Sequence, residues 1–233
     1  MPITVAIFDL DDTLYDCFGQ RVKAAHRYAS QAMVDAGLGA TVDEVFAARM
    51  EAFRADPRLS HIDAEVCRRF AVRNPDKITQ AARAAYFSFP AGKLTLFPAT
   101  LNVLRTLQAR GVRNFVVTFG DPETQRQKIA ALGLDREPSI ERIYYAERGT
   151  LQTKEEAFRS VLRDTGAQPE QVLVIGDRPD GEIAAANRLG LHTVRIRGGE
   201  FASLEARLPE EQAKCEITEI GFVLQLPFSF GVN

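Results

Sequence analysis

Short apolar runs alternate with helical patterns along most of this chain, and this alternation limits the folds it can adopt. The runs are ITVAIF (3–8), NFVVT (114–118), IYY (143–145), QVLVI (171–175) and LHTVRI (191–196). Continuous apolar runs of this length are typical of strands buried on both faces of a parallel sheet. Because helical patterns separate the later runs, we predict an α/β fold with a doubly wound, mostly parallel, Rossmann-like sheet.

One helical stretch, residues 18–90, is too long for an ordinary crossover between two strands. Within it, apolar residues recur at helical spacing, and Gly37, Asn74-Pro75 and Pro90 supply stop signals. We therefore predict two domains. An all-helical domain, 17–91, is inserted into an α/β core domain that comprises residues 1–16 and 92–233.

The composition argues against several classes of partner. The chain has 233 residues and a formal net charge of −2, so there is no bulk charge signal for nucleic acid or an anionic membrane. Its longest apolar stretches are far below the roughly 18 residues that a membrane span needs, and we see no secretory signal. The three cysteines form no CxxC pair, which suits a reducing compartment. We expect a cytoplasmic protein, monomeric or homodimeric.

Polar residues follow several of the predicted strands. The first run leads into DLDDTLYD, which holds Asp9, Asp11, Asp12 and Asp16. The second run ends in Thr118, the fourth leads into Asp177, and Lys154 begins the helix that follows the third. Ligands of open parallel sheets bind outside the carboxyl ends of the strands. We therefore expect these side chains to meet there, with Asp12 and Asp16 serving the loop itself.

This set of residue types indicates a reaction. Several carboxylates without a His or Cys cluster suit Mg²⁺ better than zinc. A lysine and a threonine hydroxyl can face an anion held by the metal, and a carboxylate can act as nucleophile. These are the parts needed to transfer a phosphoryl group through an acyl-phosphate. We choose Lys154 as the lysine because Lys128 falls in the middle of a predicted helix and Lys93 precedes the second strand.

The same residues match the motifs of a known family. Phe8-Asp9-Leu10-Asp11-Asp12-Thr13-Leu14 matches the first motif, Val117-Thr118 with Gly120-Asp121 the second, Lys154 the third, and Val174-Ile175-Gly176-Asp177 the fourth. Over nearly its whole length the chain resembles the haloacid dehalogenase-like hydrolases. The match is to their phosphatase branch, which carries a helical C1-type cap inserted after the first strand.

The resemblance implies roles for individual residues. Asp9 attacks phosphorus, and Asp11 protonates the leaving alcohol and later activates water. Thr118, Phe119 and Lys154 form the phosphate-binding set, and relatives often have Asn at the position of Phe119. Mg²⁺ is held by Asp9, the backbone carbonyl of Asp11, Asp177 and a second acid. For that acid we favour Glu182 over Asp180. The cap is expected to close over the site and to choose the leaving group.

We therefore predict a Mg²⁺-dependent phosphatase of small phosphorylated metabolites, of the nucleotide or sugar phosphate type. Two alternatives stay open. A phosphomutase would keep both Asp9 and Asp11, and a non-catalytic binding or regulatory protein could use the same scaffold. A dehalogenase proper has no need of the acid at Asp11, which argues against that activity.

Overall fold

The computed structural model describes residues 1–55, 61–147, 150–151 and 153–231. The chain divides into two compact units, one formed by Met1–Cys17 with Lys93–Asn233 and the other by Phe18–Gly92. The predicted domain limits fall one residue before these junctions.

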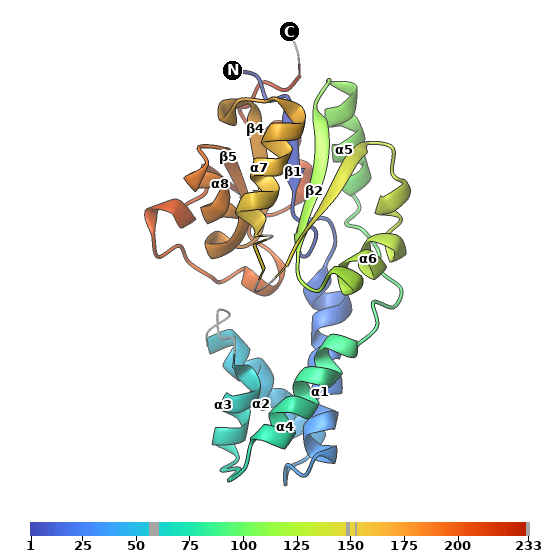
Figure 1. Cartoon of the computed structure of the whole chain (residues 1–233), viewed down its shortest axis with the longest axis vertical. Coiled ribbons are helices and arrows are strands. Elements are labelled where there is room, and N and C mark those ends of the chain that lie inside the picture. Colours follow the sequence, from blue (N-terminus) through green and yellow to red (C-terminus); the bar gives the residue numbers. More distant parts are fainter. Residues whose placement is uncertain (56–60, 148–149, 152, 232–233) are drawn as a thin grey trace. The chain divides into compact units, whose positions relative to one another are not determined.

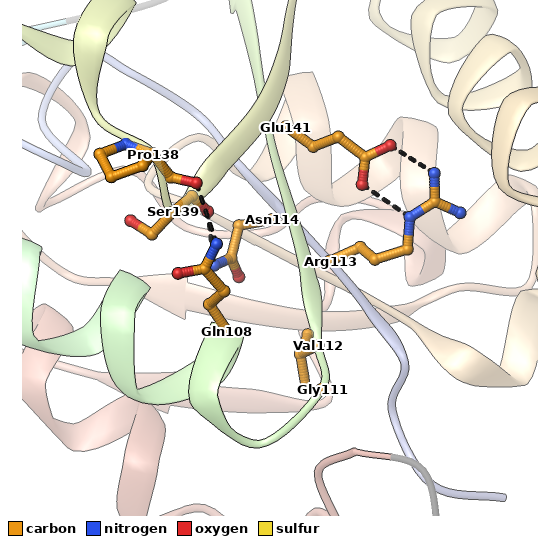
Figure 2. Close-up of a pocket in the computed structure, with 8 residues that line it drawn as sticks. All are labelled: Gln108, Gly111, Val112, Arg113, Asn114, Pro138, Ser139 and Glu141. Atoms are coloured by element: carbon orange, nitrogen blue, oxygen red, sulfur yellow. Dashed lines mark hydrogen bonds and ion pairs between the residues drawn. The ribbon is translucent and has the colours of Figure 1, made fainter.

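Six strands form a single sheet in the described part of the first unit, and each neighbouring pair is parallel (Figure 1). They are β1 (Val5–Phe8), β2 (Arg113–Phe119), β3 (Ile140–Ala146), β4 (Val172–Gly176), β5 (His192–Ile196) and β6 (Cys215–Ile217). The order across the sheet is β3-β2-β1-β4-β5-β6. The predicted fold class is confirmed. Only β6 was missed, because it has three residues and just Ile217 is buried.

Helices cover both faces of this sheet. They are α5 (Thr100–Ala109), α6 (Pro122–Ala131), α7 (Lys154–Thr165) and α8 (Ala184–Arg188). On one face, Val5 and Ile7 of β1 share a core cluster with Phe158 of α7. On the other face, the Asn114 side chain of β2 donates a hydrogen bond to the Leu104 carbonyl of α5. Burial on both faces explains why these strands read as continuous apolar runs.

Side-chain caps fix where two of the helices begin. The Asp121 carboxylate accepts a hydrogen bond from the Thr124 amide before α6, with Pro122 as the first helical residue. The Thr153 hydroxyl accepts one from the Glu156 amide before α7. Both caps satisfy amides that the helix itself leaves unpaired. The second cap makes Lys154 the first residue of α7.

The second unit is built from helices in its described part. They are α1 (Lys23–Asp35), α2 (Val42–Ala55), α3 (Ile62–Arg69) and α4 (Asp76–Ser88), with a π-helical turn at Phe18–Val22 before α1. The unit has its own apolar core, which includes Met33, Val45 and Ile78. Among the described residues of the whole chain, no helix is long and apolar enough to cross a membrane.

The C-terminal segment packs on the first unit, although not as a strand. The period-two pattern at residues 224–232 predicts an edge strand. The structure instead has a 3₁₀ helix at Ile220–Gln225, followed by a single bridge between Phe230 and Ile3. Gly231 donates its amide to the Ile3 carbonyl at 2.8 Å. Pro227 has no amide hydrogen to donate to a ladder, which disfavours longer pairing. Val232 lies outside the described residues.

This packing predicts that the segment contributes to stability. Val223 is fully buried, and we expect Val223→Ala to lower the free energy of unfolding by about 1.5–3 kcal/mol, since two methyl groups leave a packed site. Gln225→Ala, at an exposed position of the same helix, is the control and should stay within about 0.5 kcal/mol of wild type. Equal melting curves for all three proteins would show that the segment does not support the core.

Candidate active site

Asp9 and Lys154 meet at the carboxyl end of β1. Asp9 directly follows β1, and its amide donates to the Ile175 carbonyl of β4 at 2.9 Å. The Lys154 Nζ lies 2.6 Å from Asp9 Oδ1 and 2.6 Å from Glu182 Oε2. Asp9 and Glu182 are buried. The first residue of α7 thus provides a cation that bridges two acids from distant parts of the sequence.

Three carboxylates form a compact acidic group. One oxygen each from Asp9, Asp177 and Glu182 lies within 4.8 Å of the others. Glu182 is held there by the Arg178 amide, which donates to Oε1 at 2.6 Å. Asp180 is instead paired with the Arg178 guanidinium at 2.7 Å. Of the two acids left open by the sequence, the structure therefore brings Glu182 into this group.

Gly176 makes the approach of Glu182 possible. A Cβ atom added at position 176 would overlap the Glu182 carboxylate and its Cγ. The last residue of β4 can therefore only be glycine if the Glu182 carboxylate is to lie where it does. The glycine of the fourth motif has a steric reason in this structure.

The acidic group is short of positive charge. Burial raises the pKa of Asp9 to about 7; Glu182 and Asp11 add to this, while Lys154 opposes it. Burial and the neighbouring Glu182 and Asp9 also raise the pKa of Asp177 well above its usual range. Hard oxygen donors at this spacing, with Lys154 as the cation among them, fit a divalent cation of the Mg²⁺ type.

Asp11 lies in a different environment, which the sequence interpretation missed. Lys128 Nζ is 2.7 Å from its Oδ2 and 3.0 Å from its Oδ1. The Tyr15 hydroxyl donates to it at 2.7 Å and the Gln125 amide at 3.2 Å. Burial alone would raise the pKa of Asp11, but Lys128 and these hydrogen bonds hold it at about 2. Asp11 is therefore ionised at neutral pH.

The choice of Lys154 as the phosphate-facing lysine agrees with its contact to Asp9, but the sequence interpretation assigned no role to Lys128. The Lys128 side chain, from the middle of α6, is buried and reaches Asp11. Gln125 and Lys128 stand three residues apart, which puts them on one helix face. That face is buried, since Ile129 lies on it too. The signal available in the sequence was that two polar residues, Gln125 and Lys128, share a helix face with the apolar Ile129, which indicates that their side chains have buried polar partners.

Thr118 offers an uncommitted hydroxyl near the end of β2. Its Oγ1 is buried and has no hydrogen-bond partner among the described residues. A buried hydroxyl without a partner is costly, so this atom is suited to an oxyanion ligand. Phe119 is the last residue of β2, and its carbonyl accepts a hydrogen bond from the Gln125 side chain at 2.7 Å.

Asp12 supports the loop rather than the acidic group. Its backbone is left-handed, with φ of 54°, and its carboxylate accepts a hydrogen bond from the Glu200 amide at 2.9 Å. Gly199 lies so close that a Cβ there would overlap the Asp12 side chain. The loop after β5 is thereby fastened to the loop after β1, in line with the structural role expected for Asp12.

Comparisons with known proteins agree with this architecture. The family model for haloacid dehalogenase-like hydrolases matches residues 3–190. A glyceraldehyde 3-phosphate phosphatase of Methanopyrus kandleri is 31% identical over 221 residues, covering 92% of this chain and 93% of that protein. Its namesake from Methanocaldococcus jannaschii is 30% identical over 202 residues, covering 85% of this chain and 87% of that protein.

A solved structure gives the same result for the fold. The HAD hydrolase YfnB of Bacillus subtilis, solved with bound magnesium, has a TM-score of 0.63 at 18% identity, covering 97% of this chain and 98% of that one. The family model spans more than half of the chain and includes Asp9, Thr118, Lys154 and Asp177. The chain therefore belongs to the haloacid dehalogenase-like hydrolases.

Proposed function

We propose that the protein is a Mg²⁺-dependent phosphatase that hydrolyses small phosphorylated sugars through an aspartyl-phosphate on Asp9. The observation that carries this proposal is the meeting of Asp9, Asp177, Glu182 and Lys154 in one buried group. The names of the relatives, glyceraldehyde 3-phosphate phosphatases, favour a triose phosphate or a similar ester as substrate.

Asp9 is the proposed nucleophile. Lys154 holds one of its oxygens at 2.6 Å, which orients the carboxylate and stabilises its ionised form against burial. As the phosphoryl group transfers to Asp9, the same ammonium offsets negative charge on the transferred oxygens. The hydroxyl of Thr118, which has no partner among the described residues, donates a hydrogen bond to one of those oxygens.

The cation is proposed to be held by Asp9, Asp177, Glu182 and the backbone carbonyl of Asp11. Mg²⁺ bound there would neutralise the acidic group and polarise the phosphoryl oxygens. The raised pKa values of Asp9 and Asp177 support this assignment, because burial and neighbouring acids disfavour their ionised forms and a bound cation would offset that cost.

Asp11 is proposed as the acid and base of the two steps. Its low pKa, about 2, leaves it ionised and able to accept a proton from the water that hydrolyses the aspartyl-phosphate. For the first step it must carry a proton. A phosphate dianion that binds nearby raises the proton affinity of Asp11, because like charges disfavour its ionised form.

The role of the Phe18–Gly92 unit as a cap that selects the leaving group stays a prediction.

The nucleophile assignment predicts the effect of Asp9→Asn. An amide cannot form the aspartyl-phosphate, so phosphate release from 4-nitrophenyl phosphate should fall to background. Wild-type turnover should need Mg²⁺ and stop in EDTA. Asp35→Asn, at an exposed position of α1, serves as the control and should retain wild-type activity. A folded wild-type protein that releases no phosphate from aryl or triose phosphates with Mg²⁺ would refute the proposed function.

The role of Thr118 predicts a separation of activity from stability. Thr118→Val should lower kcat/KM about 10- to 100-fold, the loss of one hydrogen bond to a charged group. Its melting temperature should be unchanged or higher, because the hydroxyl has no partner to lose. Thr193→Val is the matched control. Its buried hydroxyl bonds to Asn187 and the Lys214 amide, so this variant should lose stability and keep its rate.

The steric role of Gly176 predicts weaker cation binding in Gly176→Ala. The added methyl group displaces Glu182, and we expect the Mg²⁺ concentration for half-maximal activity to rise about 10- to 100-fold. Gly198→Ala is the control, since a Cβ there lies 3.8 Å from its nearest neighbour, Ile196. An unchanged Mg²⁺ requirement in Gly176→Ala would remove Glu182 from the proposed cation site.

A further inference from the structure

Lys128 is a buried cation whose carboxylate partner is Asp11. It is 5% exposed, and its Nζ contacts both oxygens of Asp11, at 2.7 and 3.0 Å. Tyr15, from the loop that also holds Asp11, and Gln125, three residues before Lys128 on α6, donate to the same carboxylate. Three side chains thus converge on one carboxylate, which lies outside the apolar core.

The surroundings of Lys128 connect this group to the strand end. Gln125 Nε2 also donates to the Phe119 carbonyl at 2.7 Å, so α6 is fastened to the last residue of β2. Gly120 has a φ of 150°, and a Cβ there would lie 3.0 Å from Gln125 Nε2. The turn between β2 and α6 therefore leaves room for Gln125 to reach Asp11. The Lys128 ammonium, in turn, could not be buried at this position without the Asp11 carboxylate beside it, because burying an unpaired charge is strongly unfavourable.

The consequence is a division between two neighbouring carboxylates. Within the described residues, the compact acidic group contains Asp9, Asp177 and Glu182, and the Asp11 carboxylate is not part of it. Asp9 is paired with Lys154, and Asp11 is paired with Lys128. A carboxylate beside a divalent cation site would otherwise be drawn toward the cation, where it could not exchange a proton with the leaving alcohol.

We propose that Lys128 is a positioning residue, which with Gln125 and Tyr15 holds the Asp11 carboxylate toward the leaving group and apart from the acidic group. The inference rests on the proposed phosphatase function. It assigns to α6 a part in leaving-group protonation that the family motifs identified in the sequence do not include. A merely structural ion pair would not affect one class of ester more than another.

Leaving-group dependence tests this role. Alkoxides need a proton as they depart, whereas 4-nitrophenolate leaves readily without one. We expect Lys128→Met to lower kcat/KM for glycerol phosphate about 100-fold or more, because an Asp11 carboxyl that is no longer held in place cannot deliver its proton to the leaving oxygen, even though the loss of Lys128 raises its proton affinity. The loss for 4-nitrophenyl phosphate should be less than about 10-fold. The constant kcat/KM is the right readout because it reports the steps up to cleavage of the ester bond. Gln127→Met, exposed on the same helix, should leave both values unchanged.

A double-mutant cycle tests whether Lys128 acts through Asp11. If it does, Lys128→Met should cause no further loss on glycerol phosphate when it is added to Asp11→Asn. Losses that multiply in the double variant, or equal losses on both esters, would overturn the inference. These outcomes differ from failure of the proposed function, in which the wild-type protein itself would hydrolyse neither ester.

A second variant covers the case in which Lys128→Met does not fold. Tyr15→Phe removes only the hydroxyl that donates to Asp11 at 2.7 Å and keeps the buried ring. We expect a smaller loss that is again selective for glycerol phosphate, with melting behaviour close to wild type. Tyr15→Phe with full activity on both esters, or with equal losses on both, would contradict the proposed positioning of Asp11 by Lys128, Gln125 and Tyr15.

Discussion

Repulsion among carboxylates at the ends of β1 and β4 is the constraint around which this site is built. Asp9, Asp11, Asp177 and Glu182 lie close together because β1 and β4 are neighbours in the sheet. Buried acids at such distances cannot all be ionised without positive charge beside them. The placement of Lys154, of Lys128 and of the proposed cation follows from this requirement.

Two lysines reach the acids by different routes. Lys154 is the first residue of α7, where the Thr153 cap fixes its position, and its ammonium bridges Asp9 and Glu182. Lys128 comes from the middle of α6 and contacts Asp11. The result is opposite in sign for the two neighbouring aspartates, since the pKa of Asp9 is raised to about 7 and that of Asp11 is lowered to about 2. Chemically identical side chains two residues apart thus differ in proton affinity, which agrees with the different roles proposed for them.

The parts of this arrangement that depend on strand ends and helix caps could be predicted from the sequence. Apolar runs locate the strands, and their parallel order places Asp9, Thr118 and Asp177 at the same edge of the sheet. The contact of Lys128 depends on the rotation of α6 about its axis, which no short motif records. The tail was misread because a period-two pattern records which side chains are partly buried but not whether the backbone pairs. The 3₁₀ helix that buries Ile220 and Val223 extends to Gln225, and a single bridge follows it.

The central place of β1 has a consequence for synthesis of the chain. Val5 pairs with Arg113 and Val172, so this strand leaves the ribosome long before either neighbour exists. An apolar strand with unpaired edges is a hazard for aggregation during that interval. The acids that follow it directly keep the nascent segment charged, as gatekeeper residues do beside unavoidable apolar strands. Asp9, Asp11 and Asp12 would then reduce aggregation of the nascent chain before folding brings them to their partners.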